Sequence, residues 1–201
     1  MRGDCAWRAA AFSSATLLLT FHRRPLAAPR IRRRSGEGRI VKSSRKMARR
    51  RKDRMRISER HIDAIHKHLR RELPREGWGI VAGSQDELQR VYPMSNVAAG
   101  EVRYACDPAE LYNTLKEIEA QDLEMRCIYH SHPPAGAYFS ETDLGEAWIA
   151  AWDAPAYPGI CYLVVGFQGG TEPQEMKSFR VENGKAVEEA VEIIHERETQ
   201  S

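Results

Sequence analysis

Two histidines, a serine and an aspartate fall within one short stretch, between His130 and Asp143. The histidines, His130 and His132, end an apolar run that reads as a strand, and residues two apart in a strand point to the same side. A loop rich in proline and glycine follows, and Ser140 then opens a helical pattern. Two imidazoles and one carboxylate can therefore converge on one point. Three such ligands plus a water are the open coordination of a catalytic zinc, so His130, His132 and Asp143 predict a Zn²⁺ site.

The spacing H-S-H-x7-S-x-x-D resembles the signature of the JAMM/MPN metalloprotease family. That family also carries an upstream glutamate in a segment of the form E-x-x-G, and the residues Glu76 to Gly79 fit this form. The resemblance covers roughly residues 57–182. Bacterial sulfur-carrier-protein cysteine hydrolases look especially similar, because they also read I-Y-H-S-H followed by A-Y-x-S-x-T-D.

Each part of the pattern also has an ordinary structural explanation. Ser140 stands three residues before Asp143, which makes it a good helix cap for that backbone N–H. A His-x-His pair alone is commonly a surface or core pair, and Glu76 alone would be a solvated loop residue. The joint occurrence of all these features, in order and in the right local structure, favours the metallohydrolase interpretation.

The resemblance implies a fold, an activity and a role for each residue. The fold would be α/β, a mixed β-sheet sandwiched by helices, as in JAMM domains and cytidine deaminases. The activity would be zinc-dependent hydrolysis of a peptide or isopeptide bond at the Gly-Gly tail of a ubiquitin-like, β-grasp sulfur-carrier protein, with release of cysteine in cysteine biosynthesis. Glu76 would be the base, the Ser140 hydroxyl would donate to the oxyanion, and Asn96 would be a candidate substrate contact.

Other functions remain open at this point. The same site could remove a ubiquitin-like modifier from lysine, or the domain could be a non-catalytic MPN scaffold, although such scaffolds usually lose metal ligands and here none is lost. A nucleobase deaminase would need H-x-E together with P-C-x-x-C, and the sequence has neither.

Charge divides the 201 residues into two parts. Residues 1–56 hold 18 Lys and Arg against 3 Asp and Glu, a net of +15, whereas residues 57–201 hold 13 against 25, a net of −12. We therefore expect a basic, disordered extension over residues 1–55 and a metalloprotease domain over residues 56–201. The extension could be a targeting segment, an RNA-contacting arm or an over-extended start. The acidic body argues against nucleic-acid binding outside that extension.

Cysteine use and hydropathy indicate the compartment. The four cysteines include no C-x-x-C pair, and three of them lie in apolar runs, which is typical of buried thiols in a reducing, cytoplasmic environment. The body has no apolar run near the length of about 18 residues that a membrane span requires. Nothing in the sequence indicates an oligomeric state.

Periodicity and caps place the remaining elements. Helices are expected at 58–73, 107–121, after Ser140, and 185–198, with the histidines of the first helix (His61, His66, His68) facing solvent. Strands are expected at 78–83, 88–94, 102–106, 125–129, 160–166 and, as an edge strand, 176–182. This alternation is typical of an α/β sandwich with a mixed sheet.

Overall fold

The computed structural model describes residues 54–84, 87–100 and 103–195. The predicted basic extension therefore lies outside the described residues, apart from its last two positions. No helix in the described ranges is both long and apolar enough to cross a membrane.

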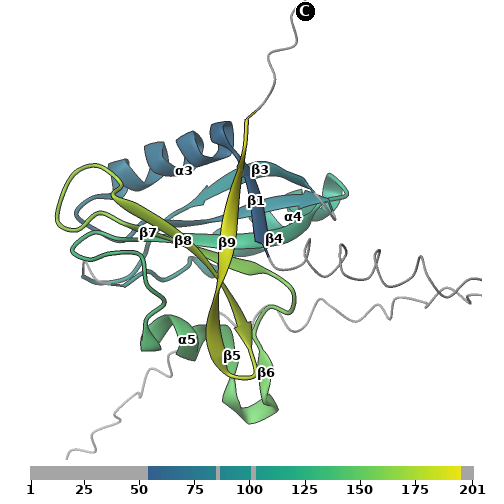
Figure 1. Cartoon of the computed structure of the whole chain (residues 1–201). Coiled ribbons are helices and arrows are strands. Elements are labelled where there is room, and N and C mark those ends of the chain that lie inside the picture. The colour runs from purple at the N-terminus through teal and green to yellow at the C-terminus, as the bar shows by residue number, and fades with distance from the viewer. Residues whose placement is uncertain (1–53, 85–86, 101–102, 196–201) are drawn as a thin grey trace, which may run out of the picture.

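A seven-stranded mixed sheet forms the centre of the molecule, with strand order β1-β9-β8-β7-β4-β2-β3 (Figure 1). Its strands are β1 (Arg54–Ser58), β2 (Trp78–Ser84), β3 (Glu87–Met94), β4 (Glu124–His132), β7 (Cys161–Gly166), β8 (Glu175–Glu182) and β9 (Lys185–Ile194). The pairs β1–β9 and β4–β7 are parallel and the others are antiparallel. A small hairpin of β5 (Trp148–Ile149) and β6 (Ala154–Pro155) encloses a short 3₁₀ turn, η1 (Ala150–Trp152).

Helices cover both faces of the sheet: α3 (Glu59–Glu72) on one, and α4 (Pro108–Ala120) with α5 (Glu141–Ala147) on the other. Successive side chains of β4 show why. Cys127 and Tyr129 are buried in the core under α3, whereas Ile128 is buried in the core under α4 and α5. His130 continues the second series, because side chains alternate along a strand. The predicted fold class, a mixed sheet sandwiched by helices, is confirmed.

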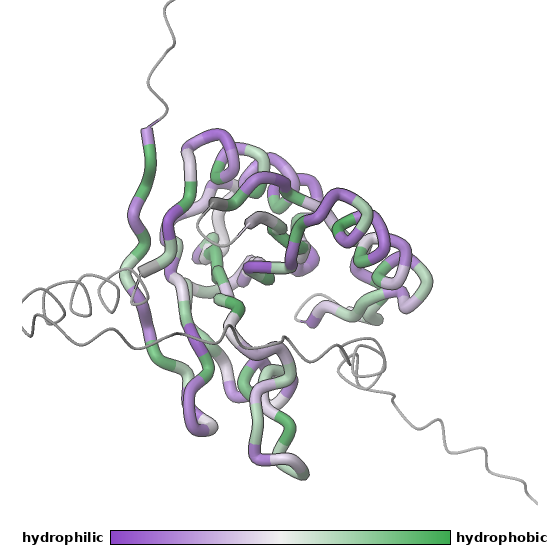
Figure 2. Tube along the Cα trace, turned by 90° about the vertical axis from the view of Figure 1, so that its right-hand side faces the viewer, coloured by the Kyte–Doolittle hydropathy of each residue, from purple (hydrophilic) through white to green (hydrophobic). Residues whose placement is uncertain are grey.

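The helices themselves follow from amphipathic patterns and caps. In Figure 2 the helix turns alternate between hydrophilic and hydrophobic colours, as expected when one side packs on the sheet. Ile65 and Leu69 of α3 are fully buried. The Asp107 carboxylate caps α4, accepting hydrogen bonds from the backbone N–H groups of Ala109 and Glu110.

The C-terminal element was predicted wrongly. Residues 185–194 form strand β9, not a helix, and they pair with β8 on one side and with β1 on the other. The turn at Asn183 and Gly184, both at positive φ, returns the chain directly onto β8. Pairing on both edges then outweighs the helical spacing of Val187 and Val191, since local propensity is a weak prior against tertiary contacts. As a result, β8 is an interior strand rather than an edge.

Three smaller differences concern α5, the segment before α4, and the histidines of α3. Helix α5 ends at Ala147, and Trp148 begins the β5–β6 hairpin instead of continuing the helix. Residues 103–107 are irregular rather than a strand. His61 and His68 are buried, with His61 Nδ1 2.7 Å from Ser58 Oγ and His68 Nδ1 3.0 Å from Tyr129 Oη. Their polar partners explain why the expectation that they face solvent was wrong: a hydrogen-bonded imidazole packs in a core at little cost.

Candidate metal centre

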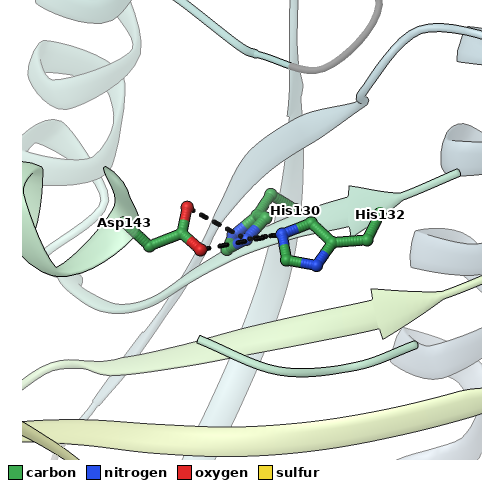
Figure 3. A group of neighbouring side chains, drawn as sticks. All are labelled: His130, His132 and Asp143. Carbon is green, nitrogen blue, oxygen red and sulfur yellow. Dashed lines mark hydrogen bonds and ion pairs between the residues drawn. The ribbon is translucent and has the colours of Figure 1, made fainter. Parts of the chain in front are cut away.

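The histidines His130 and His132 lie at the end of β4, and Asp143 lies in the first turn of α5 (Figure 3). The two Nε2 atoms are 3.2 Å apart. His130 Nε2 lies 3.4 Å from Asp143 Oδ1, and His132 Nε2 lies 3.6 Å from Asp143 Oδ2. One ligand atom from each residue falls within 4.8 Å of the others. The structure thus brings together the three residues predicted to bind metal.

These separations fit a tetrahedral zinc. With bonds of about 2.0–2.1 Å and tetrahedral angles, neighbouring ligand atoms stand about 3.3 Å apart. The observed distances of 3.2, 3.4 and 3.6 Å lie near that value, the last two measured to the two different oxygens of the Asp143 carboxylate. The donor set of two imidazoles and a carboxylate therefore fits a divalent metal with an open position.

Secondary contacts hold each ligand in place. The ring of His132 is oriented by the Gly136 carbonyl, 3.3 Å from Nδ1. His130 Nδ1 is buried and has no hydrogen-bond partner among the described residues. Its ring is held by stacking instead, with the Tyr104 ring 5.3 Å away and the Trp78 ring a further 5.3 Å beyond Tyr104.

The third ligand is fixed by a capping box. Ser140 Oγ accepts from the Asp143 backbone N–H at 3.1 Å, and Asp143 Oδ2 accepts from the Ser140 backbone N–H at 2.8 Å. Ser140 Oγ also donates to Asp143 Oδ2 at 2.7 Å. The serine therefore both starts α5 and orients the carboxylate. To donate to a substrate oxyanion, its hydroxyl would have to turn away from Asp143.

Charges in the cluster support one another. Burial alone would raise the pKa of the Asp143 carboxyl, but hydrogen bonds from His130 and His132 hold that pKa well below its usual range. Burial alone would lower the pKa of His132, but Asp143 raises it above its usual value. The carboxylate is thus ionised and ready to bind a cation. Protons compete with metal for His132 at acidic pH.

Glu76 lies at the entrance to β2 and lines the same cleft as His132 and Asp143. Burial, and then the negative charges of Asp143 and Glu146, raise the pKa of the Glu76 carboxyl to about 7, although the His132 charge opposes them. A carboxyl with a pKa near neutrality can both accept and donate a proton at physiological pH.

The position of Glu76 is set by the backbone beside it. Gly77 N–H donates to Ser131 Oγ at 2.9 Å, and the Ser131 N–H donates to the Gly77 carbonyl at 2.9 Å. Ser131 thus points away from the metal ligands on either side of it and ties β4 to the turn that bears Glu76. It holds the geometry and has no access to substrate.

Asn96 is not available as a substrate contact. Its side chain is buried, and Nδ2 donates to the carbonyls of Glu76 and Arg103. Its Oδ1 accepts from the backbone N–H groups of Ala98 and Ala105. The Asn96 side chain therefore holds the backbone beside Glu76 in place. The predicted role of Asn96 as a substrate contact is wrong.

Sequence reasoning missed part of the cleft wall. The missed residues are Arg103, Tyr104, Tyr138 and Glu146. Glu146 could have been predicted from the sequence, because it stands one helical turn after Asp143 and so lies on the same face of the helix. Tyr138 is largely exposed and its ring lies 4.8 Å from that of His132. Arg103 lies in irregular structure, where side-chain direction follows no period.

Comparisons with known proteins identify relatives of this chain. The chain is 37% identical over 109 residues to a probable TtuB-protein conjugate cleaving protease of Thermus thermophilus, covering 54% of this chain and 67% of that protein. It is 29% identical over 137 residues to the CysO-cysteine peptidase of Mycobacterium tuberculosis, covering 67% of this chain and 88% of that protein. A solution structure of a Desulfitobacterium hafniense protein matches with a TM-score of 0.59 and 25% identity, covering 72% of this chain and 96% of that one.

The family follows from a match along most of the domain. The model that describes prokaryotic homologs of the JAB domain matches residues 58–182, which include Glu76, the β4 histidines and α5. This range agrees with the resemblance over residues 57–182, and the JAMM/MPN resemblance is confirmed. The matched range contains the two imidazoles and the carboxylate that converge beside the buried Glu76. This chain therefore belongs to the family of prokaryotic JAB-domain homologs.

Proposed function

We propose that this protein is a zinc-dependent hydrolase that cleaves the bond after the C-terminal Gly-Gly of a ubiquitin-like sulfur-carrier protein. The convergence of His130, His132 and Asp143 at 3.2–3.6 Å beside the Glu76 carboxyl carries the proposal. The printed names of two relatives support the substrate class, since one cleaves TtuB–protein conjugates and the other is a CysO-cysteine peptidase.

A zinc ion held by the three ligands would supply a water of lowered pKa and would polarise the scissile carbonyl. Glu76 takes a proton from the attacking water and later gives it to the leaving nitrogen. Hydrolysis is balanced by this transfer: the hydroxyl joins the glycine carbonyl carbon, the C–N bond breaks and the amine leaves with the proton. A carboxyl whose pKa is about 7 suits both halves of this cycle.

The other residues of the cleft bind and orient. The Ser140 hydroxyl donates to the oxyanion once it turns from Asp143 Oδ2. The loop from Pro134 to Tyr138 forms one wall of the cleft and is pinned from β8, because Glu175 accepts the Ala137 N–H at 3.0 Å. Such a fixed wall suits an extended, side-chain-poor tail, which can approach the backbone closely.

The experiment combines metal analysis and cleavage on the full chain. Bound metal is measured by mass spectrometry after purification, and the substrate is a β-grasp carrier protein extended past Gly-Gly by one cysteine. Glu76→Gln removes the proton carrier and keeps the shape. Glu124→Gln, at the exposed start of β4, is the matched control.

Each outcome is informative. One zinc per chain, cleavage after Gly-Gly, a Glu76→Gln variant at least about 10²-fold slower and an unchanged control would establish the function. Stoichiometric zinc with no cleavage of any carrier conjugate would refute the substrate class. Absence of metal together with absence of cleavage would favour the non-catalytic scaffold.

A further inference from the structure

Arg103 is the cation in a cleft whose other charged walls are acidic. Its neighbours along the cleft include Glu76, Asp143 and Glu146. The Arg103 side chain is exposed, and within the described part of the chain no carboxylate lies within the 4 Å that would make an ion pair with its guanidinium. A guanidinium at this place is available for an anionic ligand, and its planar fork matches a carboxylate.

The backbone places Arg103 on the same side of the cleft as Glu76. Asn96 Nδ2 donates to the Glu76 carbonyl at 2.7 Å and to the Arg103 carbonyl at 2.9 Å, so a single nitrogen bridges the two segments. Under the proposed function Glu76 delivers a proton to the leaving nitrogen. The leaving group must therefore lie on the side of the cleft that Arg103 shares.

An acidic residue of α5 also lines the cleft. Glu146 lies one turn after Asp143 on α5 and lines the same cleft. Burial, and then the Asp143 charge, raise the pKa of Glu146, whereas the Arg103 charge lowers it. The two side chains, which line the same cleft, are thus near enough for their charges to interact. An anion on the leaving group is thus attracted to Arg103 and repelled by Glu146, which favours its binding beside Arg103.

We propose that Arg103 binds the free α-carboxylate of a single amino acid joined to the Gly-Gly tail of the carrier. The preferred substrate is then a carrier–amino-acid conjugate. In a conjugate through a lysine side chain, the lysine carboxyl is part of a peptide bond, so the leaving group brings no carboxylate to Arg103. This inference rests on the proposed function and narrows it to one of the two classes that the names of the relatives describe.

The test changes the substrate by one charge. A carrier ending in Gly-Gly-Cys is prepared both with a free C-terminal carboxylate and as the C-terminal amide, and kcat/KM is measured for each. The wild-type protein should prefer the acid by roughly 10-fold, the range expected for a charge-assisted hydrogen bond. In Arg103→Gln the preference should collapse toward 1. Arg70→Gln, on the helix that covers the opposite face of the sheet, is the matched control and should keep the full preference.

A binding measurement separates recognition from turnover. Calorimetry on the Glu76→Gln protein should show tighter binding of the acid than of the amide, and adding Arg103→Gln should abolish the difference. The preference should also shrink as salt rises, because the pair is exposed to solvent. A third substrate, the carrier joined to a lysine side chain in a peptide, should be cleaved less efficiently than the acid by the wild-type protein.

The outcomes distinguish the two proposals. Cleavage of acid and amide at equal rates by the wild-type protein would overturn the role of Arg103 and leave the hydrolase function standing. An equal loss for both substrates in Arg103→Gln would likewise overturn it and indicate a contact with the carrier tail. Failure of the wild-type protein to cleave any of the three substrates would refute the proposed function, and this inference with it.

Discussion

Replacing Glu76 with glutamine should change how the stability of the metal-free protein depends on pH. Glu76 is 8% exposed, and the pKa of its carboxyl rises from the ordinary 4.5 to about 7, with burial as the largest cause. Between these two values the folded protein holds a proton that the unfolded chain has released. Folding stability must therefore fall as pH rises through this window. Glutamine does not titrate, so the variant should lack this loss.

The size of the effect follows from the two pKa values. A difference of about 2.5 pH units, at about 1.36 kcal/mol each, gives an upper bound of about 3.4 kcal/mol. The carboxyl faces a cleft open to solvent, and screening there reduces the figure to about 1–2 kcal/mol. The stability advantage of Glu76→Gln over the wild-type protein should grow by that amount from pH 5 to pH 8. Each kcal/mol corresponds to roughly 2–4 °C in Tm for a chain of this size.

The assay is urea unfolding with chelator present, at pH 5, 6, 7 and 8, for the wild-type protein, Glu76→Gln and Glu124→Gln. Asp143 contributes stability that is lost as pH falls, because its pKa is lowered, but all three proteins share this term. Parallel pH profiles for wild type and Glu76→Gln would refute the reasoning, since Glu76 would then titrate like a solvated glutamate. Zinc should shrink the difference, because a nearby cation lowers the pKa of Glu76.

Three further predictions follow from the site and the core. Zinc at 100 times its Kd should stabilise the wild-type protein by about 2.7 kcal/mol in thermal unfolding and should leave the stability of His132→Ala unchanged. The affinity of the wild-type protein for zinc should weaken as pH falls through the raised pKa of His132. Equal stabilisation of both proteins would place the ion elsewhere. Ser140→Ala should cost about 0.5–2 kcal/mol through the lost cap and about 10²–10³ in kcat; a variant with full kcat would exclude the oxyanion role. Gly79→Ala should destabilise the protein by about 1–3 kcal/mol in urea unfolding. A Cβ at this position would lie 2.5 Å from the Tyr92 carbonyl oxygen and against the Tyr129 ring. An unchanged unfolding midpoint would mean that this packing relaxes freely.

The sequence predicted those parts of the fold whose signals are local. The Asp107 cap of α4, the strand that ends in His132 and the helix start at Ser140 all depend on neighbours within four residues. For the same reason the three residues of the candidate metal centre could be named in advance, because two of them share one strand and the third belongs to a capping box.

What could not be predicted depends on partners far away in the chain. β1 does alternate between polar and apolar residues, with Met55 and Ile57 buried, but the alternation is short and directly follows the basic run. The strand is completed by pairing with β9, where Arg54 lies beside Ala190, 136 residues later. The buried state of His68 depends on the Tyr129 hydroxyl. The place of Arg103 in the cleft depends on the hydrogen bond from the Asn96 side chain to the Arg103 carbonyl. The contacts of His68 and Arg103 leave no periodic trace in the sequence.

The hydrogen bonds between Ser131 and Gly77 hold the shape of the site without involving any of the candidate metal ligands. The bonds that set the Glu76 turn against β4 are formed by one hydroxyl and three backbone groups, none of which belongs to a metal ligand. A related protein could therefore lose its histidines one at a time and still keep the shape of the cleft. Under the proposed function, a duplicated copy that lost its histidines would still bind the carrier tail but would no longer cleave the conjugate.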